Sequence, residues 1–305
     1  MTTDQRATLR ELRRTRTRRR LGDVEWYDVA YRAYLFALVG LIVVVTVSDA
    51  IDGVVGDDVD TGRLLATGPS ILGLGAVVAA ALGLRSGAEG GPVSVELADI
   101  RHVLLAPVPR RTVLLRPVGQ RFRSLSFGLA LVGGVLGQLV ATELDGSRAA
   151  WAASGALFGA MLGATFVGAA VLSHALRVPR WAATALGGGL LAWQGIAAWQ
   201  VWNDEITDPA AAATGSTSIV GPADLHGRVA LWGIEQQPVD AVAIAATAVL
   251  VLGSLLMCGR LRIEPLSRRG ELVSQLRFAA TVQDIRTVVL LRRQLRSEHL
   301  RAAPW

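Results

Sequence analysis

The chain has 305 residues, of which 51% are hydrophobic and only 18% are charged, where a soluble domain of this length carries about 25% charged residues. All 31 basic residues are arginine, which excludes a phosphate-binding loop of the GxxxxGK(S/T) kind and a Schiff-base lysine. The single cysteine, Cys258, excludes an internal disulfide and a cysteine-rich metal site.

Residues 1–32 form a basic segment that is rich in arginine and threonine, and aromatic residues cluster at 26–34. This pattern predicts a cytoplasmic N-terminal segment whose aromatic rings lie at the level of the lipid headgroups. The run RTRTRRR would also suit nucleic acid, but a positively charged anchor on the cytoplasmic membrane surface is the interpretation that we prefer. We therefore expect no nucleic-acid partner.

Long apolar intervals follow, and they predict an all-α, polytopic membrane helix bundle, because a helix needs about 20 mostly apolar residues to cross a bilayer. No interval contains an aspartate, glutamate, arginine or histidine in its interior, and the polar exceptions are glutamines. The predicted transmembrane domain spans residues 33–258 and has six membrane-spanning helices, at about 33–48, 65–84, 125–142, 150–173, 181–202 and 241–258.

The arginines between these spans predict the orientation, since cytoplasmic loops accumulate positive charge. Segments 1–32, 85–124, 174–180 and 259–305 hold 28 arginines, and the alternate loops hold 3. We therefore expect a multi-pass protein of a bacterial plasma membrane with both termini in the cytoplasm.

The cytoplasmic loop 85–124 contains a short amphipathic segment. Ser94 is a suitable N-cap, and Pro107 and Pro109 end the predicted helix because proline disfavours helical geometry in the residue before it. A second apolar run, TVLLRPV, is expected to join this helix to the third span by a kinked connection. The helix needs a surface to cover its apolar face, either the inner leaflet or a cytoplasmic partner.

Glycines at four-residue spacing predict close helix packing in the third and fourth spans, where small side chains let backbones approach. The five glycines are Gly133, Gly137, Gly155, Gly159 and Gly163. Packing within one chain and a seam between two copies both agree with this pattern.

The outer loop 203–240 is long and partly apolar, and its second half predicts a short helix lying in the outer interface. The tail, residues 259–305, contains an amphipathic helix at 271–298 that could lie on the membrane or dock on a partner.

The sequence lacks the usual marks of an intramembrane enzyme or an ion-coupled transporter. The four histidines are dispersed over separate segments, and no HExxH motif or paired intramembrane carboxylates can be read. We therefore expect no catalytic, cofactor-binding or metal site in this chain, and a translocation path that suits an apolar or amphipathic cargo.

The run LLAPVPRRTVLL at 104–115 resembles the loop between the second and third spans of six-span ABC-type export permeases. The whole layout is similar to a divergent, actinobacterial-type member of that class. The resemblance implies a permease subunit that couples a separate ATP-binding subunit to export and works with a second permease half, as a homodimer or heterodimer. ATP would then bind to the partner subunit.

The resemblance also implies a set of partner-docking residues in the coupling helix. They are Leu97, Asp99, Ile100, Arg101, Leu104, Leu105, Pro107, Val108 and Arg110. The acidic residue and Gly-Thr pair that usually precede this helix are absent. The alternative function is a non-transporting membrane scaffold or accessory protein that binds partners or anionic lipid through its basic cytoplasmic segments.

Overall fold

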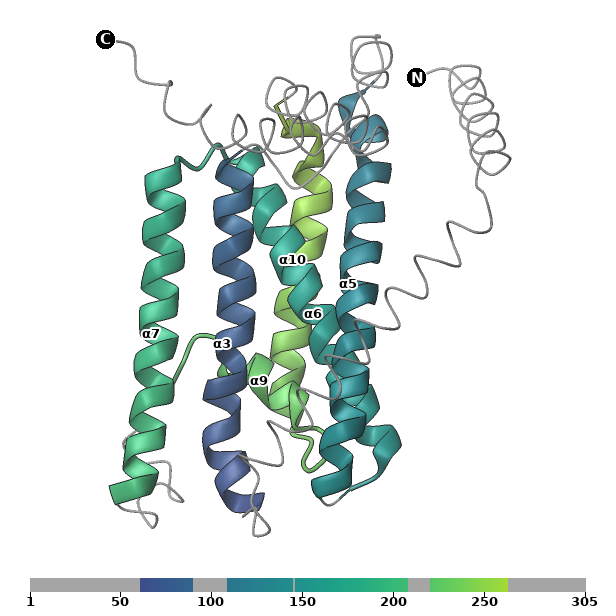
Figure 1. Cartoon of the computed structure of the whole chain (residues 1–305). Helices are drawn as coiled ribbons and strands as arrows, with labels where there is room; N and C mark the ends of the chain where they lie inside the picture. The colour runs from purple at the N-terminus through teal and green to yellow at the C-terminus, as the bar shows by residue number, and fades with distance from the viewer. Residues whose placement is uncertain (1–60, 90–108, 145, 208–219, 263–305) are drawn as a thin grey trace, which may run out of the picture.

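The computed structural model describes residues 61–89, 109–144, 146–207 and 220–262, which form helices and turns and contain no strand. Long helices lie side by side in this part of the chain, with one short helix enclosed among them (Figure 1). The long helices are α3 (Thr61–Ala88), α5 (Arg110–Glu143), α6 (Arg148–Ala175), α7 (Arg180–Thr207) and α10 (Ala241–Met257). The short elements are α9 (Asp224–Ala230) and two 3-10 turns, η1 (Pro238–Asp240) and η2 (Cys258–Arg260).

Four of these helical stretches are long and apolar enough to cross a membrane: Leu64–Ala88, Arg110–Thr142, Arg148–Ala175 and Pro238–Arg260. Their outward faces carry large apolar side chains such as Phe127, Val249 and Leu252, as expected where lipid tails are the solvent. The all-helical part of the prediction is therefore confirmed for the described residues, and these four stretches fit a membrane protein. The predicted first span, 33–48, lies outside the described residues.

Helix α7 coincides with the predicted span 181–202 but is not among those four stretches. Its glutamines, tryptophans and glycines lower its mean hydropathy. Trp181 and Trp199 are 76% and 63% exposed near opposite ends of the helix, whereas Gln194 between them is completely buried.

Helix α5 begins fifteen residues before the predicted third span, 125–142, because residues 110–124 continue the same helix. The predicted loop 85–124 is correspondingly shorter, and the run TVLLRPV belongs to the first turns of α5 rather than to a kinked connection. Leu114, Val118 and Phe122 are buried at four-residue spacing, while the arginines between them are exposed. This buried face stabilises the helix despite Pro117.

A hydrophobic cluster joins the first half of α5 to the end of α6 and to the turn after α10. Leu114 and Val118 pack with Val167, Val171 and the buried residues at 258 and 261. The first half of α5 is thus part of the bundle's core, although its sequence carries five arginines.

The five predicted packing glycines lie where α5 and α6 contact each other. A Cβ atom on Gly133 would collide with the carbonyl oxygen of Gly155, and one on Gly159 would collide with that of Leu129. Gly137 and Gly163 also lie close to backbone atoms of the facing helix. These contacts form within one chain, as the first of the two interpretations of the glycine pattern requires.

The two ends of the bundle differ in charge. The C-terminal ends of α3, α6 and α10 meet the N-terminal ends of α5 and α7 at one end, uppermost in Figure 1. We call it the arginine-rich end, because its helix ends and turns contain Arg85, Arg110, Arg111, Arg116, Arg121, Arg123, Arg177, Arg180, Arg260 and Arg262. Arg148 and Arg228 lie in the half nearer the opposite end.

Candidate functional site in a re-entrant segment

Residues 220–240 are the described part of the connection from α7 to α10, and they lie inside the half of the bundle away from the arginine-rich end (Figure 1). Helix α9, in the middle of this re-entrant segment, packs against α3, α6 and α10. Gly227 contacts the carbonyl oxygen of Pro69 so closely that no side chain would fit there. The predicted short helix therefore exists, but it lies among the long helices rather than in the outer interface.

Gln194 of α7 holds the start of the re-entrant segment. Its Nε2 donates to the carbonyl oxygen of Ser70 at 2.8 Å and to Oδ1 of Asp224 at 2.7 Å. Its Oε1 accepts a hydrogen bond from the backbone N–H of Ala223 at 3.0 Å. Non-helical backbone inside an apolar bundle needs such partners, since an unpaired polar group there costs several kcal/mol.

Asp224 completes this polar contact and also accepts a hydrogen bond from the backbone of the turn that precedes it. Its Oδ2 accepts from the backbone N–H of Gly221 at 2.6 Å, while Oδ1 accepts from Gln194. One amide and one carboxylate thus join α3, α7 and the re-entrant segment. Because Gln194 stands thirteen residues before the end of α7, the contact lies near the middle of that helix.

His226 joins the segment to α10 through a defined tautomer. Its Nε2 lies 3.2 Å from Oγ1 of Thr247, and that hydroxyl donates its only proton to the carbonyl oxygen of Ala243 at 2.9 Å. The Thr247 oxygen must therefore accept from the histidine, so Nε2 carries a hydrogen.

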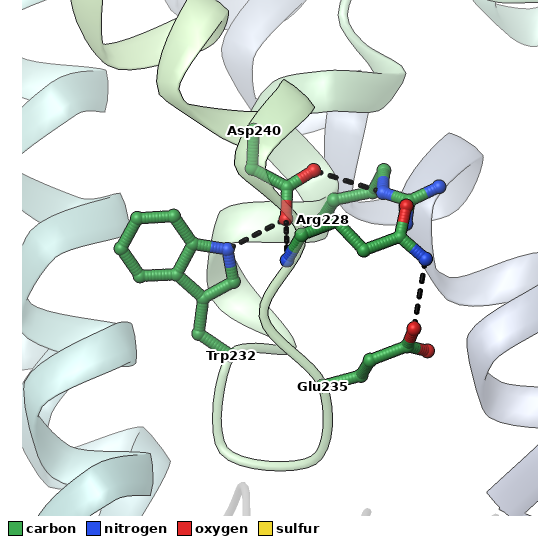
Figure 2. A network of polar contacts seen from close by, with 5 residues as sticks. Arg228, Trp232, Glu235 and Asp240 are labelled. Atoms are coloured by element: carbon green, nitrogen blue, oxygen red, sulfur yellow. Dashed lines mark hydrogen bonds and ion pairs between the residues drawn. The ribbon is translucent and has the colours of Figure 1, made fainter.

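Asp240 is the acceptor of a second polar network at the start of α10 (Figure 2). The residue is 1% exposed. Its Oδ1 accepts from Nε of Arg228 at 2.9 Å, and its Oδ2 accepts from Nε1 of Trp232 at 2.8 Å and from the backbone N–H of Gln237 at 3.1 Å. A buried carboxylate with three donors is well satisfied, and it fixes the turn between α9 and α10.

A small pocket of about 150 Å³ opens beside this network. It is lined by the start of α3 and by the end of the re-entrant segment: Leu65, Pro69, Arg228, Leu231, Glu235, Gln237 and Asp240. The re-entrant segment thus brings two acidic groups and one guanidinium to the same cavity.

The predicted partner-docking residues lie mostly outside the described part of the chain. Only Arg110 is described, and it is the exposed first residue of α5 at the arginine-rich end. The other eight (Leu97, Asp99, Ile100, Arg101, Leu104, Leu105, Pro107 and Val108) fall in the interval between α3 and α5.

His174 connects three elements at the arginine-rich end. Its Nδ1 lies 3.0 Å from the carbonyl oxygen of Gly87, which can only accept, and its Nε2 accepts from the backbone N–H of Arg262 at 3.3 Å. In this arrangement Nδ1 is the donor and Nε2 the acceptor of the ring. The neighbouring Ser173 hydroxyl donates to the carbonyl oxygen of Leu84 at 2.9 Å. The ends of α3 and α10 are both held to α6 here.

Sequence reasoning missed the site formed by Gln194, Asp224, Arg228 and Asp240. Apolar spans free of charge suggested a bundle without polar groups, and the polar side chains arrive from a loop instead. The signal in the sequence was a glutamine in a span, together with a loop that contains Gly221, Gly227 and several acidic residues. No local sequence rule pairs Gln194 with Asp224, which stands thirty residues later. Among the described residues, no group of three or more histidine, cysteine, aspartate or glutamate side chains could hold a metal ion.

Comparison with known proteins assigns no relative: no protein-family model, no curated protein and no solved structure matches the chain.

Proposed function

We propose that this chain is the membrane-spanning permease subunit of an ATP-driven, ABC-type exporter that moves an apolar or amphipathic cargo. In this proposal the domain has six spans, including 33–48 and α7, and the arginine-rich end faces the cytoplasm of a bacterial cell. A separate subunit binds ATP and docks on the interval between α3 and α5, and a second permease half completes the transporter.

The observation that carries the proposal is the way α5 begins. Its first residue, Arg110, is the last of the predicted docking residues, and its first turns are packed by Leu114 and Val118 into the core of the bundle. A displacement of the docking residues would therefore move α5, which is packed against the rest of the bundle, and would not be absorbed by a flexible loop. Close glycine contacts then connect α5 to α6 along the rest of its length.

The end of the bundle away from the arginines supports the same proposal. The re-entrant segment that closes this end is held by a small number of hydrogen bonds, which can be broken and formed again. The re-entrant segment occupies the space between α3, α6 and α10 and is held by Gln194 and by His226. Hydrogen bonds of this kind are individually worth about 1 kcal/mol, so a motor that hydrolyses ATP can exchange them. An apolar cargo would leave by displacing this segment.

The test is co-purification of the tagged, full-length chain from its own membranes. We expect an ATP-binding subunit among the captured proteins, identified by mass spectrometry. Leu104→Asp and Arg110→Asp should each lower its recovery by about tenfold, as expected for changes at the centre of an interface. Arg121→Asp is the matched control, because it makes the same charge change at an exposed position farther along α5.

Normal recovery of the ATP-binding subunit with both docking variants would show that the docking assignment is wrong. Capture of other proteins or anionic lipid through residues 271–298, with no ATP-binding subunit in any preparation, would favour the scaffold function instead. Deletion of 271–298 separates the two proposals, since it should abolish scaffold binding and leave the docking of the ATP-binding subunit intact.

A further inference from the structure

The pocket beside Asp240 has a guanidinium with unused donors. Arg228 gives its Nε to Asp240, and among the described residues neither of its Nη amino groups has a hydrogen-bond partner. The side chain is 32% exposed, so the Nη groups can meet a ligand. Asp240 fixes the guanidinium in place, and a fixed guanidinium binds phosphate or carboxylate oxygens through two parallel hydrogen bonds.

The same pocket presents acceptors that would repel a simple anion. Glu235 is an exposed carboxylate on the pocket wall, and its Oε1 accepts from Nε2 of Gln237 at 2.8 Å. Pro69 has no N–H, so it cannot give the carbonyl oxygen of Leu65 its usual helical hydrogen bond. Pro69 and Leu65 both line the pocket. The Glu235 carboxylate favours a cationic N–H donor.

The charges decide which ligand fits. Asp240 already has three donors and is compensated by Arg228, which leaves Glu235 as the uncompensated charge. The Nη groups of Arg228 are donors that call for acceptor oxygens on the ligand, and Glu235 calls for a positive group. The apolar side chains of Leu65 and Leu231 suit a short methylene link between the two charges.

We propose that this pocket binds the zwitterionic aminoethyl phosphate group. The phosphate oxygens accept from the Nη groups of Arg228, and the ammonium donates to Glu235. The group could belong to a phosphatidylethanolamine headgroup, since the pocket lies toward the end of the bundle where headgroups meet the helices, or to free phosphoethanolamine. The inference does not rest on the proposed export function.

The experiment uses the full-length chain purified into nanodiscs made of phosphatidylethanolamine and phosphatidylglycerol in equal amounts. Native mass spectrometry then measures which lipid stays bound after the bulk lipid is removed. We expect phosphatidylethanolamine to be retained about tenfold over phosphatidylglycerol, because only the former carries the ammonium. Addition of phosphoethanolamine distinguishes the two sources: displacement of the lipid at micromolar concentration identifies the free solute, and no displacement identifies the headgroup.

Two variants test the two halves of the pocket. Leu65→Phe fills the cavity without touching the Asp240 network and should abolish selective retention. Glu235→Gln removes the partner of the ammonium on an exposed side chain and should bring retention of the two lipids to within about twofold of each other. Leu82→Phe, on an exposed face of α3 away from the pocket, is the matched control and should retain phosphatidylethanolamine like the unchanged protein.

Equal retention of the two lipids by the unchanged protein, with no effect of phosphoethanolamine on its thermal unfolding, would overturn the inference. Selectivity that survives both Leu65→Phe and Glu235→Gln would overturn it as well, because the lipid would then bind elsewhere. If Leu65→Phe lowers the unfolding temperature of the protein, its loss of lipid selectivity cannot be interpreted. The test then depends on Glu235→Gln, which changes an exposed side chain.

Discussion

Gln194 and Gln138 are both glutamines in apolar helices, and the structure gives them opposite environments. Gln194 of α7 is completely buried and makes three hydrogen bonds, whereas Gln138 lies on the exposed side of α5. The amide of Gln194 matters because it pairs polar groups of the re-entrant segment inside the bundle. Without it, the N–H of Ala223 and one oxygen of Asp224 would be left unpaired inside the bundle.

This contrast gives a matched prediction. Gln194→Leu keeps the volume of the side chain and removes its donors and acceptor, so we expect the protein to lose about 3 kcal/mol of stability. Gln138→Leu makes the same chemical change on an exposed face and should change stability by less than about 0.5 kcal/mol. Thermal unfolding of both variants in the same lipid or detergent measures the difference. Equal stabilities would show that Gln194 does not hold the re-entrant segment.

The residue scale is also where sequence reasoning had the least success. Gln194 could be recognised as a polar exception in a predicted span, but its partner Asp224 stands thirty residues later in what looked like an outer loop. Hydropathy averages cannot tell a polar residue that faces lipid from one that faces a folded-back segment. Gln194 faces the folded-back segment because α9 packs against α3. This packing joins residues that are far apart in the chain, so averages over neighbouring residues cannot predict it.

At the scale of elements, the sequence predicted the positions of the later helices well and the start of α5 badly. The predicted spans 65–84, 150–173 and 181–202 each lie inside an observed helix, because long apolar runs outweigh local exceptions. Arginines and Pro117 made residues 110–124 look like a loop. The four-residue spacing of Leu114, Val118 and Phe122 was the signal for a buried helical face.

Helix α5 also provides a prediction in which one substitution has opposite effects at two positions. Gly133→Ala places a methyl group against the carbonyl oxygen of Gly155 and should destabilise the protein by about 1–3 kcal/mol. Gly128→Ala adds a methyl group where no atom lies within 4 Å, and should stabilise the helix by about 0.5–1 kcal/mol. The measurement is the unfolding midpoint of each variant in lipid.

A fall in stability at both positions would mean that α5 packs against a further surface near Gly128. No change at Gly133 would contradict the close contact between α5 and α6. The pair therefore tests the arrangement of these two helices independently of any functional assay.

At the scale of the whole molecule, the bundle has two chemically different ends. Arginines gather at one end, and the re-entrant segment with its acidic residues enters from the other. We propose that this asymmetry places the arginine-rich end in the cytoplasm, because positively charged segments tend to stay there. Orientation can be measured without knowing the cargo, so it separates the topology from the rest of the functional proposal.

Cysteine labelling of intact cells tests this orientation. The single native cysteine, Cys258, is buried, so a Cys258→Ala background offers no competing thiol. In that background, Glu235→Cys should react with a membrane-impermeant maleimide from outside. Arg177→Cys, in the turn between α6 and α7 at the arginine-rich end, should react only after the cells are permeabilised. The reverse pattern would show that the protein is inserted the other way round.

The length of α5 has a mechanical consequence. At 34 residues and 1.5 Å per residue it is about 51 Å long, whereas the hydrocarbon core it crosses is about 30 Å thick. If its far end lies at the opposite membrane boundary, about 20 Å of rigid rod projects beyond the hydrocarbon at the arginine-rich end. A tilt of about 10° about its midpoint would carry Arg110 sideways by about 4 Å and the far end by the same distance in the opposite direction. A movement imposed at Arg110 would therefore be accompanied by a movement of equal size and opposite direction at the far end of α5.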